Sequence, residues 1–572
     1  MNAIGARLRD RAAARVIASR GVPLRWLLLA ALCACVRTAV CADAVAPVAP
    51  VDAGAAIFER GVLGSGAPLE AVHQDGVRLH GAAAACINCH RRSGLGSKEG
   101  NNTIPPITWR YLVHPRAQTA EDLDIPFVPG MRVDREPYTE ATLARAVRDG
   151  IDADGKPLGR LMPQYALSDA DMAALSGYLK RLDARRPAGV TDTVLHFATI
   201  ITPDADPVKR AGMLDVLQHY FADKNAFPIG ATPPLRATRK MMFMVNRRWE
   251  LHVWQLTGPP DTWRAQLAQF LARQPVLAVV SGLGGRNWAP VHDFCEEAAV
   301  PCLFPNVEVP VGTDHDFYSV YFSRGVLLES DLIAKRIEDE LGARPAPKAA
   351  KTAKTATTVW QVYRAGDNGE RGAQALAAAL KTRGIAVSNR ALAPGARVAD
   401  ALRRIPRGDV LVLWLRPPDL AALDRVPPTS DLVFMSGLLG GLDDAPLPPE
   451  WRGVTRIAYP FDLPAARRVR VDYAFGWFAI RQIPIVAPQV QADTYLACGL
   501  LAETLSHLVD AFVREYLVER VEDMLERRIL TGYYPRLTLA PGQCFASKGG
   551  YIVRFAGADR TTVRADGDWV VP

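Results

Sequence analysis

The sequence lacks three features that would place it in a common class. Its apolar run WLLLAALCACV at 26–36 is too short to span a bilayer, which takes about 20 residues. The C-x-x-C pair at Cys86 and Cys89 has no second copy, which argues against a zinc site built from two such pairs. The glycine-rich stretches GLGG at 282–285 and GLGSKEG at 94–100 lack the spacing of dinucleotide-binding and phosphate-binding loops.

Positive charge is also scarcer than the formal net charge of +8 suggests. Residues 1–42 hold seven Arg and one Asp, a surplus of six positive charges that leaves only +2 for the rest of the chain. No nucleic-acid partner is therefore expected. A length of 572 residues, with 49% hydrophobic and 22% charged residues, predicts a folded protein of several domains.

The first 42 residues have the three parts of a secretory signal peptide. A basic segment precedes the apolar run at 26–36, and the small-residue stretch AVCA follows at 39–42. This pattern predicts export to the periplasm, cleavage near Ala42 and no membrane span in the mature chain. A lipid anchor on Cys35 and an uncleaved anchor are the alternatives.

The stretch AAAACINCHRRSGLG at 82–96 contains a C-x-x-C-H motif made of Cys86, Cys89 and His90. In an exported chain this motif is the attachment signal for c-type haem. The two thiols add to the haem vinyl groups, and the adjacent imidazole binds the iron. The sequence therefore predicts one covalently attached haem c.

A second iron ligand is expected in the loop GKPLGRLMPQY, where Met162 precedes Pro163 and a helix. Ser168 is the expected N-cap of this helix. Its expected apolar face consists of Met172, Leu175, Leu179 and Leu182.

Together with an opening helix that carries Phe58, these motifs resemble a class I c-type cytochrome over residues 50–184. The resemblance implies an all-α domain with Met162 as the distal haem ligand. The alternative ligands in the same segment are Met131, His73, His80 and His114.

Ligation by His90 and Met162 occupies both axial positions of the iron. It leaves no open position for oxygen or peroxide, so the predicted function is electron transfer by an electron carrier and not catalysis. A periplasmic redox protein is the expected partner. A role as a haem-linked dehydrogenase subunit, or as an enzyme that passes electrons from a bound substrate to the haem, is an alternative.

After a linker at 184–190 the sequence alternates short apolar runs with helical stretches. This alternation predicts parallel sheets covered by helices on both faces. We expect one α/β lobe over 192–342, a flexible insertion over 343–358, a second lobe over 359–480, and a closing segment over 481–572 that completes the module.

The loops VVSGLGGRNW and QVYRAGDNGERG and the passage HDFCEEAAVPCLFPNVEVP resemble a type I periplasmic binding protein of the branched-chain amino acid type, over about 192–480. The predicted fold is thus multidomain, an all-α cytochrome domain followed by a two-lobed α/β module. Small ligands of such folds bind at the carboxyl ends of strands. The candidate cleft residues there are Ser281, Gly282, Asn306, Tyr363 and Asp367.

The two modules leave two functions open. In the first, the α/β module docks the redox partner or senses a small molecule for the electron carrier. In the alternative, the chain is a solute-binding protein of a transport system, and its haem domain is accessory.

The four cysteines outside the leader and the haem motif are an even number, and an oxidising compartment would allow two disulfides. The pairs Cys295 with Cys302 and Cys498 with Cys544 are candidates, and the alternative is that all four are buried apolar residues.

Overall fold

The computed structural model describes residues 52–99, 102–114, 135–183, 188–226, 247–313, 316–342, 357–508, 512–557 and 559–572. Residues 53–572 form one unit. The predicted signal peptide at 1–42, Cys35 and Met131 lie outside the described residues, as does most of the linker at 184–190 and of the insertion at 343–358.

The segment from 52 to 183 combines helices with short strands. Its helical elements are α2 (Ala53–Ala55), η1 (Ala56–Arg60), η2 (Gly81–Ala84), α3 (Ile87–His90), α4 (Trp109–Val113), α5 (Glu140–Asp149) and α6 (Asp169–Asp183). Its strands are β1 (Glu70–Val72), β2 (Arg78–His80) and β5 (Gln164–Tyr165), in the order β2-β1-β5, and the pair β3 (Ser97–Glu99) with β4 (Asn102–Ile104). The prediction of an all-α domain is therefore wrong, because the segment contains strands as well as helices.

Helix α6 follows the sequence pattern closely. The backbone N–H of Asp171 donates to the Ser168 hydroxyl at 3.1 Å, which confirms Ser168 as the N-cap. The four predicted apolar residues of the helix are all buried, because they repeat at helical spacing on one face. The buried ring of Phe58 packs against Tyr178 of α6, with ring centroids 5.2 Å apart. The closing helix and the opening helix thus share one core.

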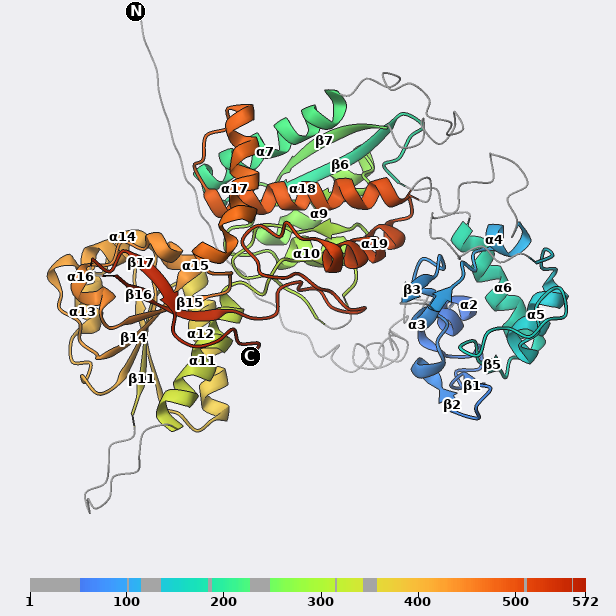
Figure 1. Cartoon of the computed structure of the whole chain (residues 1–572), viewed down its shortest axis with the longest axis horizontal. Helices are drawn as coiled ribbons and strands as arrows, with labels where there is room; N and C mark the ends of the chain where they lie inside the picture. The colour runs from blue at the N-terminus through green and yellow to red at the C-terminus, as the bar shows by residue number, and fades with distance from the viewer. Residues whose placement is uncertain are drawn as a thin grey trace, which may run out of the picture. The chain divides into compact units, whose positions relative to one another are not determined.

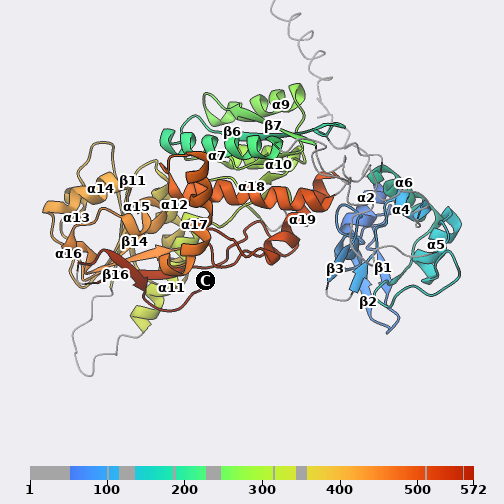
Figure 2. The same ribbon diagram turned by 45° about the horizontal axis from the view of Figure 1, so that its top comes forward.

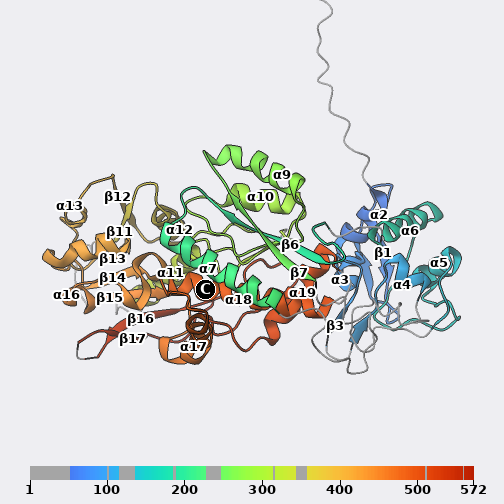
Figure 3. The ribbon, with the colours of Figure 1, turned by 90° about the horizontal axis from the view of Figure 1, so that it is seen from above.

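The first α/β lobe contains a five-stranded parallel sheet in the order β10-β9-β8-β6-β7. Its strands are β6 (Val194–Ile201), β7 (Arg248–Gln255), β8 (Ala278–Val280), β9 (Cys302–Leu303) and β10 (Ser319–Val320). Helices α9 (Trp263–Arg273) and α10 (Ala289–Glu297) lie on one side of β6 and β7, and α7 (Pro207–Ala226) lies on the other (Figure 3). A short 3-10 turn, η4 (Pro260–Thr262), precedes α9.

The second lobe contains a seven-stranded sheet in the order β12-β11-β13-β14-β15-β16-β17. Its parallel strands are β11 (Val359–Arg364), β12 (Val387–Leu392), β13 (Val410–Trp414), β14 (Leu432–Ser436) and β15 (Thr455–Tyr459). Helices α11 (Val326–Gly342) and α12 (Asn368–Thr382) cover one face. The shorter helices α13 (Val398–Leu402), α14 (Pro417–Ala421) and α16 (Pro449–Arg452), with η5 (Ala422–Arg425), cover the other (Figures 1 and 2).

Between the strands of this lobe lie two further short elements, α15 (Gly437–Gly440) and η6 (Leu442–Asp444). The two-lobed α/β fold and the helices on both faces of its sheets are as predicted. The apolar runs with few polar residues form central strands because both of their faces are covered.

The C-terminal residues contribute to both lobes. Helix α18 (Pro488–Leu508) packs against α7 of the first lobe, alongside α17 (Pro464–Arg481) and α19 (Arg514–Arg527). The antiparallel strands β16 (Tyr551–Ala556) and β17 (Thr562–Ala565) extend the second sheet beyond β15, with β17 at the edge. The closing segment therefore packs a helix against the first lobe and adds two strands to the second sheet. Because these two strands are antiparallel, the second sheet is mixed and not wholly parallel.

The four cysteines of the α/β module form no disulfide in the structure, and all are buried. Cys295, Cys302 and Cys544 lie in one apolar cluster, whereas Cys498 lies in another. The structure thus matches the alternative of buried apolar residues and separates Cys498 from Cys544. Among the described residues, no helix is long and apolar enough to cross a membrane.

One buried acid makes the stability of the second lobe depend on pH. Glu329 of α11 is fully buried, contacts the Ser436 hydroxyl and accepts a hydrogen bond from Leu438 N at 2.8 Å. Burial raises its pKa to about 8. The folded state therefore binds a proton that the unfolded state releases, and this lowers stability as the pH rises from the ordinary carboxyl pKa towards 8.

We expect Glu329→Gln to remove this dependence, because glutamine is neutral at every pH. The free energy of unfolding of the variant should rise relative to that of wild type between pH 5 and pH 8, by up to about 1.4 kcal/mol per pH unit, and thermal melting at each pH measures the change. Glu338→Gln, at a half-exposed position of the same helix, is the control. Parallel pH profiles for wild type and Glu329→Gln would contradict the assignment.

Candidate functional site

The C-x-x-C-H motif lies at a cavity of about 530 Å³ in the segment from 52 to 183. Cys86, Cys89 and His90 line it from α3 and its N-cap, and Met162 lines it from the loop before β5. Most of the remaining wall is apolar and includes Phe58, Leu79, Leu112, Leu143, Val147, Leu175 and Leu179. The structure thus brings all four predicted haem-binding residues to one cavity.

The His90 ring is held by the backbone. Its Nδ1 lies 3.0 Å from the carbonyl oxygen of Pro105, an arrangement that orients the ring and its other nitrogen. Burial lowers the pKa of His90 to about 4, although the hydrogen bond to Pro105 opposes this shift. The imidazole is therefore neutral at neutral pH, which is the form that binds a metal.

The two thiols of the motif differ in environment. Cys86 is half-buried at the N-cap of α3, and burial raises the pKa of its thiol to about 12. Cys89, one turn along, is exposed. Neither forms a disulfide in the structure.

The donor set fits haem c. Two thiols, a neutral imidazole and a thioether line a largely apolar cavity, and Arg135 and Arg160 are among its lining residues. Haem is a flat apolar ring with two carboxylates, so apolar walls and cationic groups suit it.

Of the alternative ligands, His73 also lines the cavity, whereas His80 is exposed beside Glu70 at 3.9 Å. His114 is exposed at the end of α4.

Three of the predicted cleft residues are packed inside the first lobe. The Ser281 hydroxyl lies 2.9 Å from that of Thr494 in α18, and the Asn306 amide donates to Ser281 at 3.0 Å. A Cβ added to Gly282 would lie 2.6 Å from the Trp288 ring. Ser281 and Asn306 thus tie α18 to the strand ends through Thr494, and Gly282 packs against Trp288.

The other two predicted residues belong to the second lobe. Tyr363 is buried at the end of β11 and is 7% exposed. Asp367 forms two hydrogen bonds of 2.8 Å with the guanidinium of Arg416. Asp367 therefore enters a network of charges that continues into the first lobe.

This cross-lobe network is centred on Glu308, in the segment after β9. Its carboxylate accepts hydrogen bonds from Lys209 of α7 at 2.9 Å and from Arg416, which follows β13, at 2.8 Å. The Asn368 amide donates to Glu308 at 2.8 Å and to the Gly285 carbonyl at 3.2 Å. Burial raises the pKa of Glu308, but Lys209 and Arg416 outweigh it and hold the pKa well below its ordinary value.

Four residues of this network were not predicted from the sequence: Lys209, Glu308, Asn368 and Arg416. Arg416 follows strand β13 as Asp367 follows β11, so the rule that selected Asp367 also selects Arg416. Glu308 lies two residues after Asn306, which was selected. For Lys209, in the first turn of α7, no signal in the sequence separates it from other exposed lysines.

Comparisons with known proteins give structural similarity only. No family model matches the chain, and no curated protein sequence matches it either. A fatty acid ABC transporter substrate-binding protein from Thermomonospora curvata matches at 15% identity and a TM-score of 0.46, covering 68% of this chain and 95% of its own.

Two further structures each cover 66% of this chain. A branched-chain amino acid transporter substrate binding protein from Streptococcus pneumoniae, in complex with isoleucine, matches at 12% identity and a TM-score of 0.46, over 66% of this chain and all of its own. A leucine binding protein from Thermotoga maritima matches at 13% identity and a TM-score of 0.43, over 66% and 99%. Since each TM-score is below 0.5, the ligands of these proteins are not assigned to this chain.

These comparisons correct the predicted function. The structures found are substrate-binding proteins of transporters, which favours the alternative, a solute-binding protein, over the prediction of a periplasmic cytochrome that carries out electron transfer. The prediction that the chain functions as a periplasmic electron-transfer cytochrome is therefore wrong.

The network makes a prediction about stability. Glu308→Gln removes the charge that faces Lys209 and Arg416, so we expect unfolding to become easier by roughly 1.5–3 kcal/mol, the range for hydrogen bonds to charged groups. Thermal melting of the variant measures this loss. Glu297→Gln removes a half-exposed carboxylate that pairs with Arg264 in the same lobe, and it should change the melting temperature little. Equal losses in the two variants would show that Glu308 has no special role.

Proposed function

We propose that the chain is the solute-binding protein of a transport system, that it binds a small zwitterionic molecule between its two α/β lobes, and that its N-terminal segment is an accessory haem c domain. In this proposal the chain is exported to the periplasm, as its N-terminal pattern predicts. The observation that carries the binding function is the network of Lys209, Glu308, Arg416 and Asp367 across the two lobes.

The distribution of charge between the lobes supports this ligand class. The first lobe contributes one cation, Lys209, and one anion, Glu308. The second lobe contributes one cation, Arg416, and one anion, Asp367. When the lobes separate, each lobe therefore presents one positive and one negative charge near its strand ends.

A molecule that carries an ammonium group and a carboxylate can replace the cross-lobe pairs. Its carboxylate would take the place of Glu308 on Arg416, and its ammonium group would face an acidic residue. The four side chains carry no net charge together, so a zwitterion keeps the network neutral, whereas a ligand with one charge only would add an unbalanced charge to a partly buried site, which is costly. Amino acids are the simplest molecules with the required pair of groups.

We expect at least one L-amino acid to raise the melting temperature of the mature chain when amino acids are tested one at a time. A ligand that binds only the folded state stabilises it, by about 2.7 kcal/mol at a hundred times Kd. Arg416→Gln should abolish the shift. Arg407→Gln, which alters an exposed arginine paired with Asp431 in the same lobe, should retain it. No shift with any amino acid, or a shift that survives in Arg416→Gln, would contradict the proposal.

The accessory haem domain rests on a separate observation, the cavity lined by the C-x-x-C-H motif and Met162. Cys86 and Cys89 would hold the group through thioether bonds, and His90 and Met162 would take the two axial positions. When bound, haem supplies an iron ion with those two positions to fill. The role of this chain's residues is to orient the ring and to keep water from it, since the walls are mostly apolar.

We expect the exported chain to retain haem after denaturation, and Cys86→Ala with Cys89→Ala to lose it. Met162→Ala should abolish the methionine-to-iron charge-transfer band in the visible spectrum. Met172→Leu is the control, because Met172 lies buried in the core of α6 and should leave the band unchanged. A band that persists in Met162→Ala would point to another ligand, such as His73, and failure of this test leaves the amino acid test unaffected.

A further inference from the structure

Three side chains outside the two sites described above converge on one face of the first sheet. His196 lies on β6, and Glu250 and His252 lie on β7. The parallel register pairs His196 with Glu250 and Ala198 with His252. Since side chains two residues apart in a strand point to the same face, all three side chains lie on one side of the sheet.

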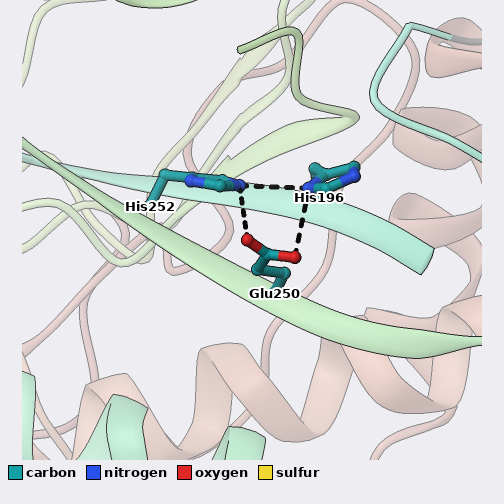
Figure 4. A group of neighbouring side chains, drawn as sticks. All are labelled: His196, Glu250 and His252. Atoms are coloured by element: carbon teal, nitrogen blue, oxygen red, sulfur yellow. Dashed lines mark hydrogen bonds and ion pairs between the residues drawn. The ribbon is translucent and has the colours of Figure 1, made fainter.

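The polar atoms of these side chains face one another (Figure 4). His196 Nδ1 lies 3.1 Å from His252 Nε2. The Glu250 carboxylate lies 3.8 Å from His196 Nδ1 and 3.9 Å from His252 Nε2. The three groups thus enclose a small space with two nitrogen donors and one carboxylate at its edges.

The backbone around the three residues is held firmly. His196 N donates to the Gly189 carbonyl at 2.8 Å, and the His196 carbonyl accepts from Leu277 N at 2.8 Å. The two imidazoles are mostly buried, with side-chain exposures of 14% for His196 and 22% for His252, whereas Glu250 is 49% exposed. The donors are therefore fixed from the strands and open to solvent on the carboxylate side.

We propose that His196, Glu250 and His252 bind one divalent transition-metal ion, of the class represented by Zn²⁺. Two imidazole nitrogens and a carboxylate oxygen are a ligand set that Zn²⁺ accepts, with a water molecule as the fourth ligand. Ligand atoms about 2.0–2.2 Å from a tetrahedral ion lie about 3.3–3.5 Å apart. The two nitrogens lie 3.1 Å apart, and they lie 3.8 and 3.9 Å from the two different oxygens of the Glu250 carboxylate, so the separations lie on either side of this value.

A hydrogen bond between the two imidazoles explains the arrangement less well. One shared proton satisfies the two facing nitrogens, but the carboxylate of Glu250 lies too far from either nitrogen to accept a hydrogen bond. Among the described residues, no Lys or Arg pairs with the Glu250 carboxylate, and the two imidazoles are the basic groups that lie within 4.0 Å of it. A cation among the three groups gives each of them a partner at once.

Zinc titration of the mature chain tests this site. The background should carry Cys86→Ser and Cys89→Ser, so that the thiols of the haem motif cannot bind the metal. After removal of metals with a chelator, we expect calorimetry to give one tight site for Zn²⁺ per chain. Co²⁺ in its place should give the visible absorption bands of a four-coordinate ion.

Glu250→Gln and His252→Ala in this background should each weaken binding by on the order of 100-fold or more, since each removes a ligand. His219→Ala is the control, because His219 lies on α7 of the same lobe beside Asp215 and away from the cluster. Unchanged melting temperatures without metal would show that the variants are folded. The proposal is wrong if no zinc binds, or if the Glu250→Gln and His252→Ala proteins bind zinc as tightly as the control.

Discussion

The Glu308 carboxylate is the group on which the association of the two α/β lobes depends most directly. It is a mostly buried anion, and it remains charged because Lys209 of one lobe and Arg416 of the other donate to it. An anion removed from water is stable only when it is paired and hydrogen-bonded. Any separation of the lobes must break the pair with Arg416, so water or a ligand has to replace it. The same constraint that joins the lobes thus defines what can enter between them.

The cavity at the C-x-x-C-H motif depends on a different principle. Many of its apolar wall residues belong to helices in which such residues repeat at helical spacing, and Cys86, Cys89 and His90 lie in one short helical turn and its N-cap. The carbonyl of Pro105 orients the His90 ring, and Met162 lies in the loop that leads to β5. Local packing therefore fixes these groups, whereas the interface between the lobes depends on charges from distant parts of the chain.

Much of the fold could be predicted because its signals are local. The run VLHFATII forms β6 over its whole length, and DVLVLWLR contains β13, since apolar β-branched residues favour covered central strands. Antiparallel β16 and β17 could not be placed, because the sheet they join is assembled from residues more than ninety positions away. The short strands β1, β2 and β5 were missed for another reason, because two or three residues carry no usable periodicity.

By itself the sequence determined the chemistry-bearing residues that lie together in a motif, Cys86, Cys89 and His90, and the two-lobed α/β class. Only the tertiary structure decided which strand-end residues enter the network of charges between the lobes. Ser281 and Asn306 point into the first lobe and bind Thr494, whereas Asp367 reaches Arg416 and, through it, Glu308. It also decided that His196 meets His252, 56 residues later. The physical reason is that a local motif sets its own geometry, but the direction of a side chain at a strand end depends on what packs against it from distant parts of the chain.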